Sequence, residues 1–82
     1  MPEREIEVEY FALLREKRGL GSETVTTTAA TPREFYTELD ARHDFGLRLE
    51  SLLVSVNDEV GDWDSDLSAA RKVVFIPPVA GG

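Results

Sequence analysis

The chain has 82 residues, enough for one small domain with a single core. Its hydrophobic share of 41% beside 30% charged residues is ordinary for a folded protein and argues against disorder. Because the net charge is -7 and cysteine is absent, we expect no nucleic acid and no anionic membrane as partner, no disulfide and no thiol nucleophile. The acidic charge is compatible with a basic protein partner or with a saline or hot habitat, and composition does not separate the two.

The start of the chain predicts a cytoplasmic protein. Residues Met1–Glu5 carry neither the basic leader nor the apolar core of a signal peptide. No apolar run reaches the roughly 18 residues that a membrane-spanning helix needs. We therefore expect a chain without a membrane anchor.

The first third of the chain predicts two strands with a short helix between them. Apolar residues alternate with glutamates over Glu5–Tyr10, the period-two pattern of a strand with one buried face. Phe11 follows on the glutamate side of that alternation, where solvent or a partner is expected. Residues 12–18 then predict a short helix that stops at a glycine, and the threonine-rich residues 22–28 predict an edge-like strand.

The rest of the chain predicts one main helix and two further strands. Thr31–Glu34 has the residues of a capping box with proline at the first helical position, and the helical pattern fades near His43. Alternation over residues 52–56 predicts a third strand that ends in a turn at Asn57. Residues 72–76 are apolar on both faces, typical of a central strand that is covered on both sides or that reserves one face for a partner. This order predicts an α+β fold with one helix across a sheet.

The loop before the last strand carries an acidic motif that imitates a metal site. Asp62, Asp64 and Asp66 have the spacing that opens a calcium loop, but the required glycine and glutamate are replaced by Leu67 and Val73. We expect no metal there. In the same loop Trp63 is expected to pack over the sheet edge, and the single histidine, His43, to lie at a helix end or in solvent.

The C-terminus is the most informative segment. Prolines end the last strand because they donate no ladder hydrogen bond and favour extended backbone, so we place the domain at 1–76 and an extended tail at 77–82. The last four residues, fully extended, reach about 13 Å, enough to enter a pocket of another protein. The carboxylate of Gly82 would then be the reacting group, and the alternative is an inert terminus. The residues expected to thread the pocket are Pro77, Pro78, Val79, Ala80 and Gly81.

Three segments carry a family resemblance. Tyr10–Glu16, Leu52–Asn57 and Phe75–Gly82 resemble, in this order, the small subunits of molybdopterin synthase, which are ubiquitin-like β-grasp sulfur carriers. The Pro-Pro-Val-x-Gly-Gly ending is the specific part, because the related carriers of the thiamine pathway share Gly-Gly but usually lack the paired prolines. Residues 68–72 depart from the family, whose members commonly carry an acidic, glycine-containing turn there.

The resemblance implies a β-grasp domain and a function for Gly82. An E1-like activating enzyme would use ATP to adenylate its carboxylate, and a sulfur donor protein would convert the adenylate to a thiocarboxylate. The tail would then enter the large catalytic subunit of molybdopterin synthase and give sulfur to cyclic pyranopterin monophosphate. The chain would bind no cofactor itself and would be a non-catalytic subunit, with acids and bases supplied by the large subunit.

The resemblance also implies a docking surface for the large subunit and the activating enzyme, made by Phe11, Arg15, Val60 and Ile76. On composition alone, Val60 and Ile76 are more typical of a core. Three other functions stay open. They are a protein modifier joined to target lysines through Gly82, a sulfur carrier of another pathway such as thiamine synthesis, and an interaction module with an inert tail.

Overall fold

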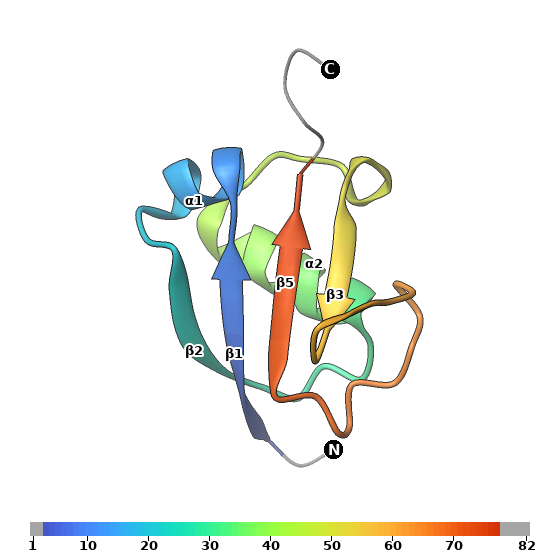
Figure 1. Cartoon of the computed structure of the whole chain (residues 1–82). Helices are drawn as coiled ribbons and strands as arrows, with labels where there is room; N and C mark the ends of the chain where they lie inside the picture. The colour runs from blue at the N-terminus through green and yellow to red at the C-terminus, as the bar shows by residue number, and fades with distance from the viewer. Residues whose placement is uncertain (1–2, 78–82) are drawn as a thin grey trace.

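The computed structural model of the chain describes residues 3–77 and shows a mixed sheet crossed by one helix (Figure 1). The elements are β1 Arg4–Tyr10, α1 Ala12–Arg18, β2 Ser22–Thr27, α2 Pro32–His43, the short 3-10 helix η1 Leu49–Ser51, β3 Leu53–Val56, β4 Glu59–Val60 and β5 Lys72–Ile76. The five strands lie in the order β2-β1-β5-β3-β4. The predicted α+β fold with one main helix across the sheet is therefore confirmed.

The first and last strands lie side by side in the middle of the sheet. β1 is parallel to β5, with Tyr10 opposite Phe75, while β1 and β2, β3 and β5, and β3 and β4 are antiparallel pairs. Because parallel strands end at the same edge, the residues that follow β1 and the residue that follows β5 lie at one end of the sheet. Figure 1 shows α1 at this end, where β1 and β5 both point.

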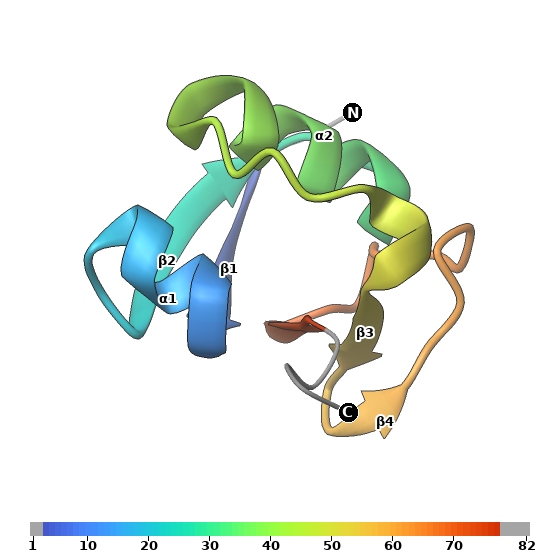
Figure 2. The ribbon, with the colours of Figure 1, turned by 90° about the horizontal axis from the view of Figure 1, so that it is seen from above.

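The core lies between the sheet and α2, which covers one face only (Figure 2). Alternation works as predicted in β1, whose even-numbered apolar residues are buried while its glutamates face away. The buried core side chains of strands and helix include Ile6, Val8, Tyr10, Val54, Val73, Phe75, Phe35, Tyr36 and Leu39. In the part of the chain that the structure describes, no helix is long and apolar enough to cross a membrane.

Helix α2 begins where the capping residues predict. Thr31 is its N-cap, and the Thr31 hydroxyl oxygen accepts a hydrogen bond from the amide of Glu34 at 3.2 Å. Pro32 occupies the first helical position, where a missing N–H costs nothing. The helix ends at His43, followed by Asp44 in the left-handed conformation with a φ of 52°. His43 thus lies at the helix end, as expected, and its ring packs 5.7 Å from that of Phe45.

Two short elements, η1 and β4, were not predicted. A strand of two residues is too short to show alternation, and β4 exists because Asn57 and Asp58, with φ of 51° and 71°, make a tight hairpin turn back from β3. Asn57 also holds the turn before β5: its side-chain oxygen accepts from the amides of Arg71 and Lys72 at 2.9 and 3.1 Å. Asn57 therefore fixes the backbone at the start of β5.

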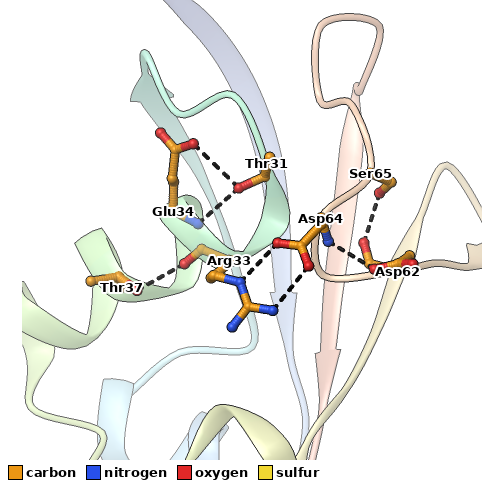
Figure 3. A network of polar contacts seen from close by, with 7 residues as sticks. All are labelled: Thr31, Arg33, Glu34, Thr37, Asp62, Asp64 and Ser65. Carbon is orange, nitrogen blue, oxygen red and sulfur yellow. Dashed lines mark hydrogen bonds and ion pairs between the residues drawn. The ribbon is translucent and has the colours of Figure 1, made fainter.

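The acidic loop is tied to the start of α2 by the polar network in Figure 3. Arg33 makes two hydrogen bonds to the carboxylate of Asp64, at 2.8 and 3.0 Å. Asp62 accepts from the amide of Asp64, and Asp66 accepts from Ser68. The three carboxylates therefore serve the loop's own turns and one ion pair, and residues 3–77 contain no group of three metal-ligating side chains.

The prediction that Trp63 packs over the sheet edge is wrong, because Trp63 packs on the central strand β5. Its ring stacks on Phe75 of β5, with centroids 6.0 Å apart and planes 7° apart, and it meets the ring of Tyr36 edge-on. The main-chain oxygen of Trp63 accepts from the amide of Arg33 at 2.9 Å, which holds the loop against α2. Burial of this ring adds to the core that α2 covers.

Candidate functional site

The candidate site is the sheet face that α2 leaves open, at the end where the chain leaves β5. In the register, Leu53 pairs with Ile76, and Tyr10 pairs with Phe75. Phe11 follows Tyr10, so it comes alongside Ile76 at the same end of the sheet. Three segments far apart in the sequence therefore meet beside Pro77, the last residue that the structure describes.

Phe11 lies on the glutamate side of β1, as the alternation predicts. Its backbone is extended, with φ −123° and ψ 153°, and its side chain is 43% exposed, whereas neighbouring Tyr10 is 1% exposed. Phe11 is also the N-cap of α1, where it forms no side-chain hydrogen bond. A phenylalanine at this position forgoes about 1 kcal/mol that serine, threonine or aspartate would contribute, so local helix stability does not explain it.

The residue after Phe11 is strained. Ala12 has a φ of 51°, in the left-handed region that costs an L-residue roughly 1–2 kcal/mol. Such strain persists only where the surrounding structure imposes it, and it is commonly found at functional sites. Here it accompanies the turn that leaves the Phe11 ring on the surface.

Four further apolar residues share this face. Ile76 lies opposite Leu53 and Val74 opposite Ser55, and Ser55 in turn pairs with Val60 on β4. Leu53 is 57% exposed and Val60 is 74% exposed, while Ile76 is half-buried and Val74 is buried by its neighbours. Diagonal neighbours on one sheet face lie within side-chain reach, so these residues form one surface. We call it the open-face patch: Phe11, Leu53, Val60, Val74 and Ile76.

The patch settles two alternatives that the sequence left open. Composition favoured a core position for Val60, and this is wrong, because β4 lies at the sheet edge where α2 does not reach. The apolar strand β5 is central but not covered on both sides: Val73 and Phe75 belong to the core under α2, whereas Val74 and Ile76 point to the open face.

Leu53 was missed as a site residue. Its neighbours Leu52 and Val54 are both buried, so alternation alone places Leu53 on the opposite face. That signal was available in the sequence. The sequence does not show that no element within residues 3–77 covers this face.

Arg15, also expected at the docking surface, is exposed on α1. Its side chain lies over Gly21: a Cβ added to that glycine would come 3.4 Å from Nε of Arg15. Gly21 accepts from the amide of Tyr10 at 2.8 Å, so Arg15 is held at the same sheet end as Phe11. The docking role of Phe11, Arg15, Val60 and Ile76 stays a prediction.

A partly buried polar triad fixes α1 beside the patch. The Tyr10 hydroxyl donates to Oε2 of Glu23 at 2.7 Å, and Arg18 donates to both oxygens of Glu23 at 2.8 Å. The hydrogen bonds from Arg18 hold the pKa of the Glu23 carboxyl below its usual value, whereas burial raises the pKa of Tyr10. At neutral pH Glu23 and Arg18 are therefore charged and the Tyr10 hydroxyl keeps its proton, and the three side chains link β1, α1 and β2.

The predicted reacting group lies outside the described residues, as do Pro78, Val79, Ala80, Gly81 and Gly82. Pro77, expected to begin the tail, is buried against the domain. The part of the chain that the structure describes thus carries the base of the tail and the surface around it, and the threading role of the last residues stays a prediction.

Comparisons with known proteins agree with this geometry. The profile of the ThiS family matches residues 8–82. No curated protein sequence matches the chain. Among solved structures, SAMP1 from Haloferax volcanii has a TM-score of 0.78 at 24% identity, with 96% of this chain and 100% of that chain covered, which shows the shared fold.

Two other structures are somewhat more similar in sequence. A putative molybdopterin converting factor, subunit 1, from Pyrococcus furiosus has 26% identity and a TM-score of 0.75, covering 92% of this chain and 98% of that chain. A chain of the BexX/CysO complex from Amycolatopsis orientalis has 26% identity and a TM-score of 0.67, with coverage of 94% and 99%. The chain belongs to the ThiS family and is a ubiquitin-like sulfur carrier with the β-grasp fold.

Proposed function

We propose that this chain is the sulfur-carrying small subunit of a molybdopterin synthase and that Gly82 carries the sulfur as a thiocarboxylate. One observation carries the proposal: the parallel pairing of β1 with β5 gathers exposed Phe11 and Leu53 and half-buried Ile76 around the point where the chain continues into its Pro-Pro-Val-Ala-Gly-Gly end. A partner that binds this patch receives the tail at the same time. The similarity to the converting-factor subunit of Pyrococcus furiosus supports the pathway.

The chemistry begins on the main chain. An oxygen of the Gly82 carboxylate attacks the α-phosphate of ATP in an activating enzyme, and pyrophosphate leaves. A carboxylate oxygen is a poor leaving group, but AMP is a good one. Hydrosulfide released by a donor protein can therefore attack the acyl carbon, so that the C–S bond forms as the C–O bond to AMP breaks, and loss of the remaining proton leaves a thiocarboxylate. Glycine leaves this group unhindered because it has no side chain.

The second step belongs to a large catalytic subunit. The open-face patch docks on it, the tail enters its pocket, and the thiocarboxylate gives its sulfur to cyclic pyranopterin monophosphate. Acids and bases come from that subunit. This division of labour agrees with the single histidine of the chain, His43, lying at the end of α2 and packed on Phe45.

The proposal is tested by mass spectrometry of the intact chain after incubation with its matched activating enzyme, ATP and a sulfur source. We expect one terminal oxygen to be replaced by sulfur. Adding the large subunit and cyclic pyranopterin monophosphate should return the carboxylate and yield molybdopterin. If no adenylate or thiocarboxylate forms at Gly82, the carrier function is excluded.

Two other outcomes would redirect the proposal. A thiocarboxylate that forms but gives no sulfur to the pterin indicates another pathway, such as thiamine synthesis. Conjugates between Gly82 and lysines of other proteins indicate a protein modifier.

Tail variants separate the reaction from the fold. Deletion of Gly82, or Gly81→Trp, should abolish sulfur transfer while thermal unfolding stays that of the wild type, because both residues follow the buried end of the domain at Pro77. The matched control is Asp44→Asn, an exposed residue after α2 whose left-handed backbone asparagine also tolerates. Substantial transfer by either tail variant would exclude the tail mechanism.

A further inference from the structure

A row of three glutamates borders the open-face patch. Glu5, Glu7 and Glu9 project from β1 to the face opposite the core, and the register places Glu9 beside Val74 of the patch. Phe11 continues the same row. One side of the apolar surface is therefore lined by carboxylates along a strand that ends in the patch itself.

The row is poorly neutralised within residues 3–77. Lys72, opposite Glu7, shares its ammonium between Glu9 at 3.5 Å and Asp58 at 3.9 Å. On the other side, β2 presents threonines opposite Glu5 and Glu7, which carry no charge. In the part of the chain that the structure describes, neither Glu5 nor Glu7 forms an ion pair.

This arrangement does not serve the stability of the fold. Glutamate is depleted in strands, and like charges on neighbouring positions of one sheet face repel each other. Threonine or valine at these positions would suit an exposed central strand better. A cationic surface placed over the row would remove the repulsion, so the unfavourable contacts point to a partner.

We propose that the glutamate row selects the partner of the patch: a protein whose apolar socket is bordered by arginine or lysine side chains positioned along β1. The charges would speed the encounter and orient it, while the patch supplies the buried contact. A second copy of this chain does not fit, because two such faces would bring two glutamate rows together. The inference rests on the proposed function in one respect, since it takes the large subunit and the activating enzyme as the partners.

The test measures binding rates of these two proteins, taken from the same source as the chain, at low and high salt. Wild-type association should slow steeply as salt rises. The variant Glu5→Gln/Glu7→Gln should associate roughly 10-fold more slowly at low salt, with a shallower salt dependence and a nearly unchanged dissociation rate. The control Asp44→Asn/Glu50→Gln removes the same charge at the end of α2 and in η1 and should bind as the wild type does.

The outcomes separate this inference from the proposed function. If the wild type acquires the thiocarboxylate and the glutamate variant binds as fast as the wild type at every salt concentration, the glutamate row has no role. An equal loss in the control variant would assign the effect to net charge and equally overturn the inference. If the wild type binds neither protein, the proposed function fails, and the inference fails with it.

Discussion

The two faces of this sheet use the same kind of side chain for opposite purposes. On one face, apolar residues of β1, β3 and β5 are buried under α2 together with its own Phe35 and Leu39. On the other face, Leu53 of β3 and Val60 of the adjacent strand β4 are both more than half exposed. Contiguous apolar patches are uncommon on surfaces that bind nothing. One face therefore stabilises the domain, whereas the other leaves apolar side chains accessible to a partner.

The largest effect is expected on the covered face. Phe75 is fully buried and its ring packs against those of Phe35, Tyr36 and Trp63. Phe75→Ala should lower the free energy of unfolding by about 3–5 kcal/mol, because it leaves a cavity in the core. Equilibrium unfolding in urea measures this loss of unfolding free energy. Leu53→Ala, on the open face of the neighbouring strand, is the control, and comparable losses in both variants would refute the division between the faces.

The reverse pattern is expected for the open face. Phe11→Glu should weaken binding to the large subunit about 30-fold, the effect of losing one aromatic anchor of roughly 2 kcal/mol, while thermal stability stays near that of the wild type. Calorimetric titration and a melting curve together check it. A collapse of stability with affinity retained would show that Phe11 belongs to the core instead.

A smaller effect should follow from weakening the helix that covers the core. Thr31→Ala removes the hydroxyl that accepts from the amide of Glu34 and should cost about 1 kcal/mol of unfolding free energy. Partner binding should not change. Thr37→Ala, in the same helix, removes only a hydroxyl that donates to the carbonyl of Arg33 and should be close to neutral. A larger loss at Thr37 than at Thr31 would contradict the capping argument.

The smallest effect concerns pH and the triad that holds α1 beside the patch. The pKa of Glu23 is lower in the folded chain than its usual 4.5, mainly because Arg18 donates to it. This group therefore contributes stability above pH 4.5 that is lost as pH falls through its lowered folded pKa. Melting temperatures should drop less steeply below pH 4.5 in Glu23→Gln than in the wild type. Parallel pH profiles would show that the carboxylate adds no pH-linked stability.

Local signals in the sequence led to correct predictions. The capping residues at Thr31 and Pro32 place the start of α2, and the alternation in β1 identifies both its buried face and the exposed position of Phe11. These signals depend on hydrogen bonds and side-chain directions within a few residues. The local structures that these signals predict persist in the folded chain because tertiary packing is compatible with them.

The expectation from composition for Val60 and the position predicted for Trp63 were wrong, because both positions depend on elements distant in the sequence. The exposure of Val60 follows from the place of β4 at the sheet edge, and composition favoured burial. The stacking of Trp63 on Phe75 depends on the position of the loop, which the hydrogen bond from the amide of Arg33 to the main-chain oxygen of Trp63 holds against α2. Hydrophobicity indicates that a side chain favours burial, but it does not indicate which element of the fold will cover that side chain.

By itself, the sequence determined the alternation of β1 and β3, the limits of the main helix and the diglycine end. Only the tertiary structure decided that β1 and β5 pair in parallel, which brings Phe11 beside Ile76 across 65 positions of the chain, next to the base of the tail. The physical reason is that strand order depends on the packing of all strands against α2 at once. No local preference encodes this arrangement, and without it the exposed phenylalanine and the C-terminal glycines would be unrelated features.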